Sequence, residues 1–178
     1  FTTVEGNYFL GNRKPNTGGI RIINESQSVS NNYMYGLTGQ RLRGALVIMN
    51  GVPNSTPNRY DPVIDSAMNN NIVIDSDHIE LGAGADEERS APPTTSEFTG
   101  NIILGKTNLT PFTLYDDMSG IKFEGNYLNE EASTPIKSGF ASTPYSVTTN
   151  KYGLKAPDKA LLEKIGFGEV KLSVTKTE

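Results

Sequence analysis

The sequence predicts an all-β fold of the parallel β-helix type, a solenoid with a ladder of stacked asparagines and a short C-terminal helix. Three observations support this. A short Asn-containing pattern recurs five times, a second strand-like run follows each of the first four copies, and 18 Gly and 10 Pro among 178 residues suit a turn-rich β protein. A repeat of this size cannot bury its own apolar face, whereas stacked coils bury a continuous interior.

The recurring pattern consists of one or more Asn flanked by alternating apolar residues. Its copies are VEGNYF (4–9), VSNNYM (29–34), MNNNIVI (68–74), FTGNIIL (98–104) and FEGNYL (123–128), which align Asn7, Asn32, Asn71, Asn101 and Asn126. In stacked coils, each side-chain amide can hydrogen-bond to the next and satisfy the turn. The alternative is an antiparallel sandwich, but its hairpins favour Asn-Gly, and the order here is Gly-Asn or Asn-Asn.

The second strand-like run lies between consecutive copies of the pattern. Its members are GGIRII (18–23), GALVIM (44–49), HIEL (78–81) and FTLY (112–115). Two long excursions, 50–62 and 82–96, are rich in turn-forming and polar residues and are predicted to be surface loops. Loops on one side of a solenoid commonly carry its binding residues.

The repeat defines the expected domain organisation. We expect residues 1–128 to form coils and residues 129–178 to form a linker and a short helix. The helix is predicted over 157–166, PDKALLEKIG, with Pro at its start, apolar residues four apart and Gly at its stop. Because the chain begins inside a copy of the pattern without a polar cap, we expect further coils upstream of Phe1 in the same protein.

Composition limits the classes of partner. Sixteen Lys and Arg against 20 Asp and Glu give a net charge of −4, so an anionic ligand must be held by a local basic patch. There is no aromatic and basic interleaving, and no apolar run of the length a membrane span needs, so neither nucleic acid nor membrane is expected as a partner. The absence of Cys excludes disulfides and thiolate zinc sites.

Three arginines are candidate binding residues. In GIRII, strand alternation places Arg21 on the face opposite Ile20 and Ile22, which suits bidentate recognition of a carboxylate or sulfate. Arg41 and Arg43 alternate in the same way around Leu42. Together they could form a basic stripe beside the loops, although ordinary solvated charges are the alternative for each.

His78 and Glu80 are further candidates. His78 is the single His of the chain, and without a partner nucleophile and base it forms no catalytic triad, so a structural role is its alternative. Glu80 belongs to a set of acids that could suggest calcium: Asp75, Asp77, Glu80, Asp86, Glu87 and Glu88. Their spacing is not that of an EF-hand loop, and pairing with nearby Arg or exposure to solvent is the alternative.

Four segments together resemble the polysaccharide lyases of family six, the alginate lyases and chondroitinase B-like enzymes. They are GNRKPNTGGIRII, GLTGQRLRGALVIMNGVPNS, NRY and DHIELGAGADEERSAPP, in order within residues 4–128. The resemblance implies a right-handed parallel β-helix that cleaves uronate-containing polysaccharide by β-elimination. It also implies a Lys as base, an Arg at the leaving oxygen and Ca²⁺ that neutralises the uronate carboxylate.

The resemblance also implies what this chain lacks. In the family, the catalytic Lys and Arg and the acidic calcium ligands precede the segment similar to VEGNYFLGN, with which this chain begins. We therefore expect no catalytic or metal-ligating residue here, and no activity of this chain alone. Arg21 matches a family Arg that contacts the substrate, and the expected substrate-binding set is Arg21, Arg41, Arg43, His78 and Glu80.

The expected partners are an acidic polysaccharide, with alginate preferred over dermatan sulfate, and the upstream coils of the same protein. A polymer substrate outside the cell implies a secreted or periplasmic protein. The alternative function is a non-catalytic β-helix that binds polysaccharide or serves as an adhesin module.

Overall fold

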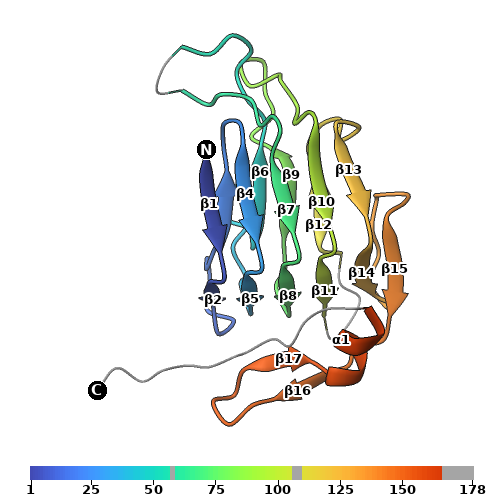
Figure 1. The fold of residues 1–178 in the computed structure, drawn as a ribbon. Helices are drawn as coiled ribbons and strands as arrows, with labels where there is room; N and C mark the ends of the chain where they lie inside the picture. Colours follow the sequence, from blue (N-terminus) through green and yellow to red (C-terminus); the bar gives the residue numbers. More distant parts are fainter. Residues whose placement is uncertain (57–58, 106–109, 166–178) are drawn as a thin grey trace.

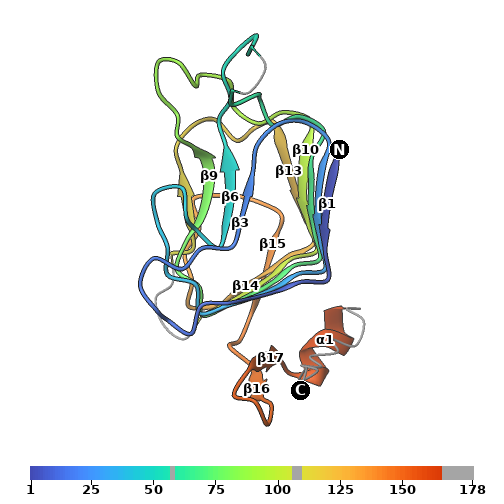
Figure 2. The same cartoon turned by 90° about the vertical axis from the view of Figure 1, so that its left-hand side faces the viewer.

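The computed structural model describes residues 1–56, 59–105 and 110–165, which form a stack of coils with a small C-terminal subdomain beside it (Figure 1). Each complete coil contributes one strand to each of three parallel sheets. Seen from the N-terminal end, the chain runs clockwise as it recedes, which makes the helix right-handed (Figure 2). The predicted right-handed parallel β-helix is confirmed.

The three sheets form the three sides of the stack. Sheet A contains β1 (Thr2–Glu5), β4 (Gln27–Ser30), β7 (Ala67–Asn69), β10 (Ser96–Thr99) and β13 (Ile121–Glu124). Sheet B contains β2 (Tyr8–Leu10), β5 (Tyr33–Tyr35), β8 (Ile72–Ile74), β11 (Ile102–Leu104), β14 (Asn126–Asn129) and β15 (Phe140–Thr143). Sheet C contains β3 (Ile20–Ile22), β6 (Leu46–Met49), β9 (Ile79–Ala83) and β12 (Phe112–Leu114).

The predicted asparagine ladder lies at the corner between sheets A and B. Asn71 is 1% exposed, its Oδ1 accepts hydrogen bonds from the backbone and side-chain amides of Asn32 at 3.1 and 3.0 Å, and its own Nδ2 donates to Asn101 at 3.0 Å. Asn101 repeats the pattern with Asn126, and Asn7 begins it with Asn32. Each of these buried side chains also donates to a backbone carbonyl one coil back, so its amide is satisfied.

The residue before each ladder asparagine explains the order Gly-Asn or Asn-Asn. All five of these residues have a positive φ: Gly6, Asn31, Asn70, Gly100 and Gly125. Gly and Asn are the residues that adopt the left-handed region most readily. The pattern therefore consists of one left-handed turn residue followed by one ladder residue.

A shorter serine ladder marks the corner between sheets C and A. The Oγ of Ser66 accepts from the backbone of Gln27 at 3.1 Å, and Ser96 Oγ accepts from Ser66 N at 3.1 Å. Asp65 and Thr95, which precede these serines, also have positive φ values. Two corners of the coil are thus fixed by side-chain hydrogen bonds.

The interior is filled by apolar side chains in register, and its C-terminal end is closed by aromatic rings. Val29 pairs with Met68, which pairs with Phe98, and all three are at most 2% exposed. Phe140 of β15 then lies 5.3 Å from Phe112 and 6.4 Å from Phe98 between ring centroids. Aromatic pairs at this spacing are stabilised beyond their buried area.

The C-terminal subdomain covers the outer face of sheet B. It consists of the antiparallel pair β16 (Val147–Thr149) and β17 (Lys155–Pro157), followed by α1 (Lys159–Ile165). Leu161 and Leu162 pack with Ile72 and Ile74 of β8. The observed helix lies within the predicted range 157–166, and Gly166, its predicted stop, lies outside the described residues. No helix in the described residues is long and apolar enough to cross a membrane.

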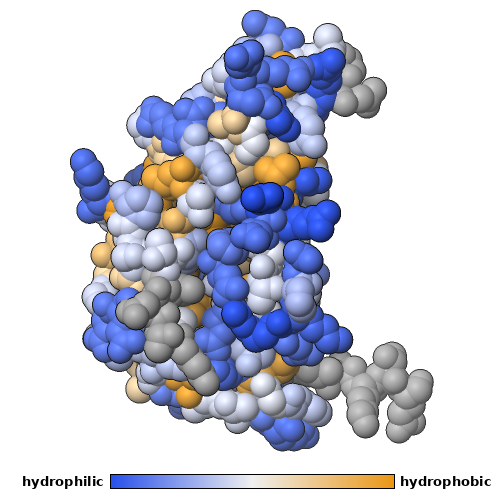
Figure 3. Space-filling model, turned by 180° about the vertical axis from the view of Figure 1, so that it is seen from behind, coloured by the Kyte–Doolittle hydropathy of each residue, from blue (hydrophilic) through white to orange (hydrophobic). Residues whose placement is uncertain are grey.

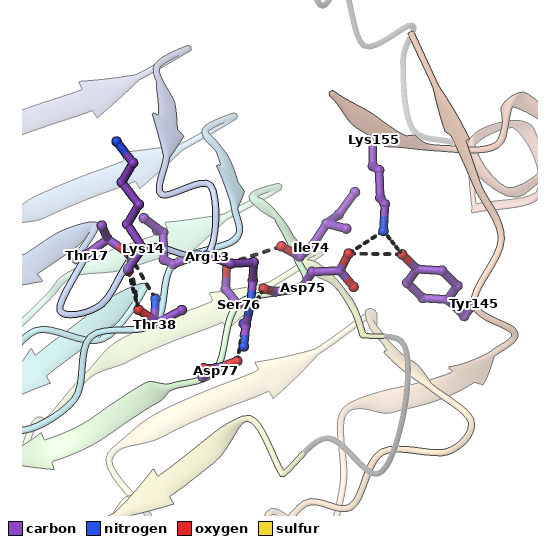
Figure 4. A network of polar contacts seen from close by, with 11 residues as sticks. Arg13, Lys14, Thr17, Thr38, Ile74, Asp75, Ser76, Asp77, Tyr145 and Lys155 are labelled. Atoms are coloured by element: carbon purple, nitrogen blue, oxygen red, sulfur yellow. Dashed lines mark hydrogen bonds and ion pairs between the residues drawn. The ribbon is translucent and has the colours of Figure 1, made fainter. Parts of the chain in front are cut away.

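A buried polar network attaches this subdomain to the coils (Figure 4). Lys155 Nζ lies 2.6 Å from Asp75 Oδ2 and 2.9 Å from the Tyr145 hydroxyl, which itself donates to Asp75. The side chains of Lys155 and Asp75 are 16% and 13% exposed. Burial alone would lower the pKa of Lys155, but the hydrogen bonds and charge of Asp75, with help from Tyr145, outweigh it and raise this pKa.

The ladder predicts a position-dependent loss of stability. We expect Asn71→Ala to lower the free energy of unfolding by about 3 to 5 kcal/mol, because it leaves the Asn32 amides and the Val29 carbonyl buried without partners. Asn7→Ala, at the exposed end of the ladder, should cost less than about 1 kcal/mol. Urea unfolding monitored by circular dichroism measures both free energies of unfolding. Equal losses for the two variants would contradict a buried, cooperative ladder.

The polar network predicts a loss of stability at alkaline pH. A raised lysine pKa stabilises the fold while lysine is charged in both states, and this contribution disappears as pH rises through the folded pKa. The difference in free energy of unfolding between the wild type and Lys155→Met should therefore be constant below pH 10, near the ordinary lysine pKa of 10.5, and shrink above it. A difference that already shrank between pH 6 and 9 would exclude this assignment.

Candidate functional site

The outer face of sheet C carries the predicted site residues. Strand pairing aligns Arg21, Val47, Glu80 and Thr113 in one row across β3, β6, β9 and β12. Ile20 and Ile22 are buried in the interior while Arg21 between them is exposed, so the guanidinium points outward from the coil. Figure 3 shows many hydrophilic side chains on the side of the molecule opposite to that viewed in Figure 1.

One rim of this face is formed by the loops that lead into β3 and β6. These loops, residues 11–18 and 38–44, pack on one another: Gly39 N donates to Thr17 O at 2.8 Å, and Thr38 Oγ1 donates to Lys14 O at 2.6 Å. Arg13 extends from the first coil to Asp77 and to the Asp75 carbonyl (Figure 4). The hydrogen bond to Asp77 and the attraction of its charge raise the pKa of Arg13, so this ion pair fastens the rim of the first coil to the third.

An open groove lies between this rim and β3. It has a volume of about 480 Å³, and its lining includes Arg21, Leu42, Arg43 and Val47. Gly19 and Gly44 form part of its surface, and a Cβ at Gly19 would lie 2.1 Å from the Ala45 carbonyl oxygen. Both glycines therefore permit close approach of neighbouring coils, and no side chain projects into the groove from either position.

Glu80 lies beneath the rim rather than on its surface. Glu80 is only 1% exposed. One of its carboxylate oxygens accepts a hydrogen bond from Arg41 N and the other accepts one from Leu42 N, each at 2.7 Å. The hydroxyl of Tyr115 donates to the same carboxylate at 3.3 Å. Burial raises the pKa of Tyr115, and the neighbouring Glu80 raises it further.

His78 directly precedes β9 and is partly buried. Its carbonyl accepts the Ala45 amide at 2.7 Å, which joins the second and third coils. Strand alternation places its side chain on the same outer face as Glu80. The structure thus gathers Arg21 and Arg43 at one groove and places Glu80 under Arg41 and Leu42, with His78 one outward position before Glu80.

The opposite rim consists of the described parts of the two predicted loops, residues 50–56, 59–62 and 82–96, which rise from the same end of the coils (Figure 1). A bridge between Gly51 and Ala91 joins them. Arg89 lies 5.5 Å above the Tyr60 ring and is held by Asp86, while Arg59 pairs with Glu88. The expected pairing of local acids with arginine is thus observed for Asp77, Asp86 and Glu88.

The two rims approach one another over sheet C. Leu42 from one rim and Tyr60 from the other pack against Val47 and Met49, which makes a small apolar cluster outside the coil. Neither Tyr60 nor Tyr115 was proposed as a site residue from the sequence, although Tyr60 is the last residue of the segment NRY. An aromatic residue in a loop and one just after a strand carry no distinctive spacing, so the packing of Tyr60 and the hydrogen bond of Tyr115 to Glu80 reveal them.

The described residues do not fit a calcium site. Within them, no three His, Asp or Glu side chains lie close enough together to hold a metal ion. Five of the six acids that could have served as ligands, all but Glu87, are engaged with arginine, lysine or backbone amides instead. No chemical step is therefore assigned to a metal held by these residues.

Comparisons with known proteins agree with this architecture. The family model for chondroitinase B matches residues 1–167. Among solved structures, the family-six (PL6) alginate lyase AlyGC is 40% identical with a TM-score of 0.88, over 96% of this chain and 23% of that one. A single-substitution variant of AlyGC gives 41% identity and a TM-score of 0.87, over the same shares of the two chains.

A mannuronic acid-specific family-six lyase from human gut microbiota is 21% identical with a TM-score of 0.65, over 91% of this chain and 36% of that one, and supports the fold alone. No curated protein sequence matches significantly. The chain spans about a quarter of the AlyGC chain, 23% of its length. The family resemblance of the four segments is confirmed, and the chain belongs to the chondroitinase B family, the polysaccharide lyases of family six.

Proposed function

We propose that this chain supplies the downstream, substrate-binding coils of a lyase that cleaves uronate-containing polysaccharide by β-elimination. The observation that carries the proposal is the groove on sheet C, where Arg21 and Arg43 line one open surface in a chain 40% identical to an alginate lyase. Each uronate of such a polymer carries a carboxylate, and Arg is the side chain best suited to bind it in a bidentate way.

The arginines orient the polymer rather than transform it. Arg21 stands on a strand whose neighbours are fixed by backbone pairing, so its backbone is held in a constant position relative to the next coil and its side chain projects from a fixed point of the outer face. We assign to it the carboxylate of a sugar next to the one that reacts. The base, the acid and the calcium ligands are assigned to upstream coils, in keeping with the family resemblance.

Alginate is the proposed substrate in preference to dermatan sulfate. The support is the described activity of AlyGC, an alginate lyase, at 40% identity. Because such polymers lie outside the cell, we propose that the protein is secreted or periplasmic. The groove's cations attract the polymer locally although the net charge of the chain is −4.

A non-catalytic polysaccharide-binding or adhesin module is the second candidate. The observation that favours it is that the described residues hold arginines for binding but no metal-ligating cluster. The two functions differ in whether upstream coils bear the catalytic Lys and Arg. Sequencing the gene upstream of Phe1 decides between them.

The first functional prediction concerns turnover. The 178-residue chain alone should produce no unsaturated uronate from alginate, because general acid–base catalysis and charge neutralisation each contribute orders of magnitude in rate. A protein that also contains the upstream coils should produce it, measured by the ultraviolet absorbance of the new double bond. Product formation by the isolated chain, verified by mass, would place the catalytic residues within it.

The second functional prediction concerns binding. Arg21→Ala should weaken the affinity of the chain for an alginate oligosaccharide about tenfold or more, because a charge-assisted hydrogen bond is lost. Lys122→Ala removes one cation from the exposed face of sheet A and is the matched control. Calorimetric titration at two salt concentrations measures both. An equal effect of the two substitutions would show that only net charge matters.

A further inference from the structure

We propose that Glu80 is a positioning residue that shapes the groove without touching the polysaccharide. It holds residues 38–44 in the conformation that presents Arg41 and Arg43 toward the outer face of sheet C. The inference rests on the proposed function and assigns to a buried acid the task of keeping that site in shape.

The first observation is the full engagement of a buried carboxylate. Glu80 is 1% exposed, and each of its two oxygens accepts a backbone N–H at 2.7 Å. Within the described part of the chain, no Lys or Arg side chain forms an ion pair with it. Backbone amides therefore supply the main compensation for burying this charge.

The second observation is the conformation of the residues that donate those bonds. Arg41 and Leu42 have φ values of 54° and 72°, in the left-handed region that residues other than Gly, Asn and Asp rarely adopt. Two successive amides that converge on one anion form an anion-binding concavity of the backbone. Here the anion is the protein's own carboxylate, which stabilises an otherwise unfavourable turn.

The third observation is that different contacts hold the rim residues 38–44 and the strand β3 in place. Arg21 lies on β3, which is paired with β6 and belongs to a coil fixed by the asparagine ladder. Arg43 follows the left-handed pair and lines the same groove. Loss of the Glu80 charge should therefore release Arg43 and leave Arg21 in place.

This difference defines a thermodynamic cycle on the 178-residue chain. Affinity for a mannuronate hexasaccharide is measured for the wild type, for Glu80→Gln, Arg43→Ala and Arg21→Ala alone, and for Glu80→Gln combined with each arginine substitution. We expect Glu80→Gln alone to weaken binding about tenfold. In the Glu80→Gln background, adding Arg43→Ala should weaken binding by less than a further factor of about two, whereas adding Arg21→Ala should weaken it as much as it does in the wild type. Glu97→Gln, the same chemical change on sheet A, is the control and should leave affinity unchanged.

A second readout needs no ligand. Hydrogen exchange at the amides of Arg41 and Leu42 should accelerate at least about tenfold in Glu80→Gln, while the ladder amide of Asn71 stays protected. If the wild type does not bind the hexasaccharide, the proposed function fails, and exchange still decides whether Glu80 holds the loop. The inference would be overturned if the Arg41 and Leu42 amides exchanged at the same rate in Glu80→Gln as in the wild type and Arg43→Ala weakened binding equally in both backgrounds. Should Glu80→Gln not fold, Glu80→Asp, which withdraws the charge by one methylene, replaces it in both measurements.

Discussion

The register between coils is the constraint on which the rest of this structure depends. Side chains alternate between the two faces of each strand, so a slip of one residue would turn Arg21 into the interior and expose Ile20 and Ile22. The asparagine ladder prevents such a slip, because each buried amide has one acceptor and its donors are satisfied only by the equivalent residue of the next coil and a carbonyl of the previous one. The left-handed residue before each Asn fixes the corner at which the ladder stands.

The same register gives the outer face of sheet C its chemical character. Arg21 and Glu80 belong to one row because β3, β6 and β9 pair in parallel, although the two residues are 59 positions apart in the sequence (80 − 21). Their environments are opposite. The arginine projects into an open groove, whereas the carboxylate is covered by a loop that wraps over it.

Much of this architecture could be predicted because short-range sequence patterns determine it. The aligned asparagines, the apolar alternation and the outward direction of Arg21 each follow from spacing within one coil. The C-terminal helix was predicted from its own sequence, but the hairpin and the packing of both on sheet B could not be, because the apolar contacts are made by a few residues such as Leu161 and Tyr145 in a polar segment. The burial of Glu80 was equally hidden, since its partners are backbone amides of another coil, and backbone amides carry no sequence signature.

The unequal lengths of the coils have a consequence for how such proteins diversify. Successive ladder asparagines are 25, 39, 30 and 25 residues apart, yet they stack with nearly the same hydrogen-bond geometry. The extra residues leave the cross-section at one corner, between sheets C and A, and form the rim that bears Tyr60 and Arg89. Insertions or deletions there change one rim of the groove but not the spacing of the coils. The range of sugars that fit can therefore change during evolution while the β-helix itself stays the same.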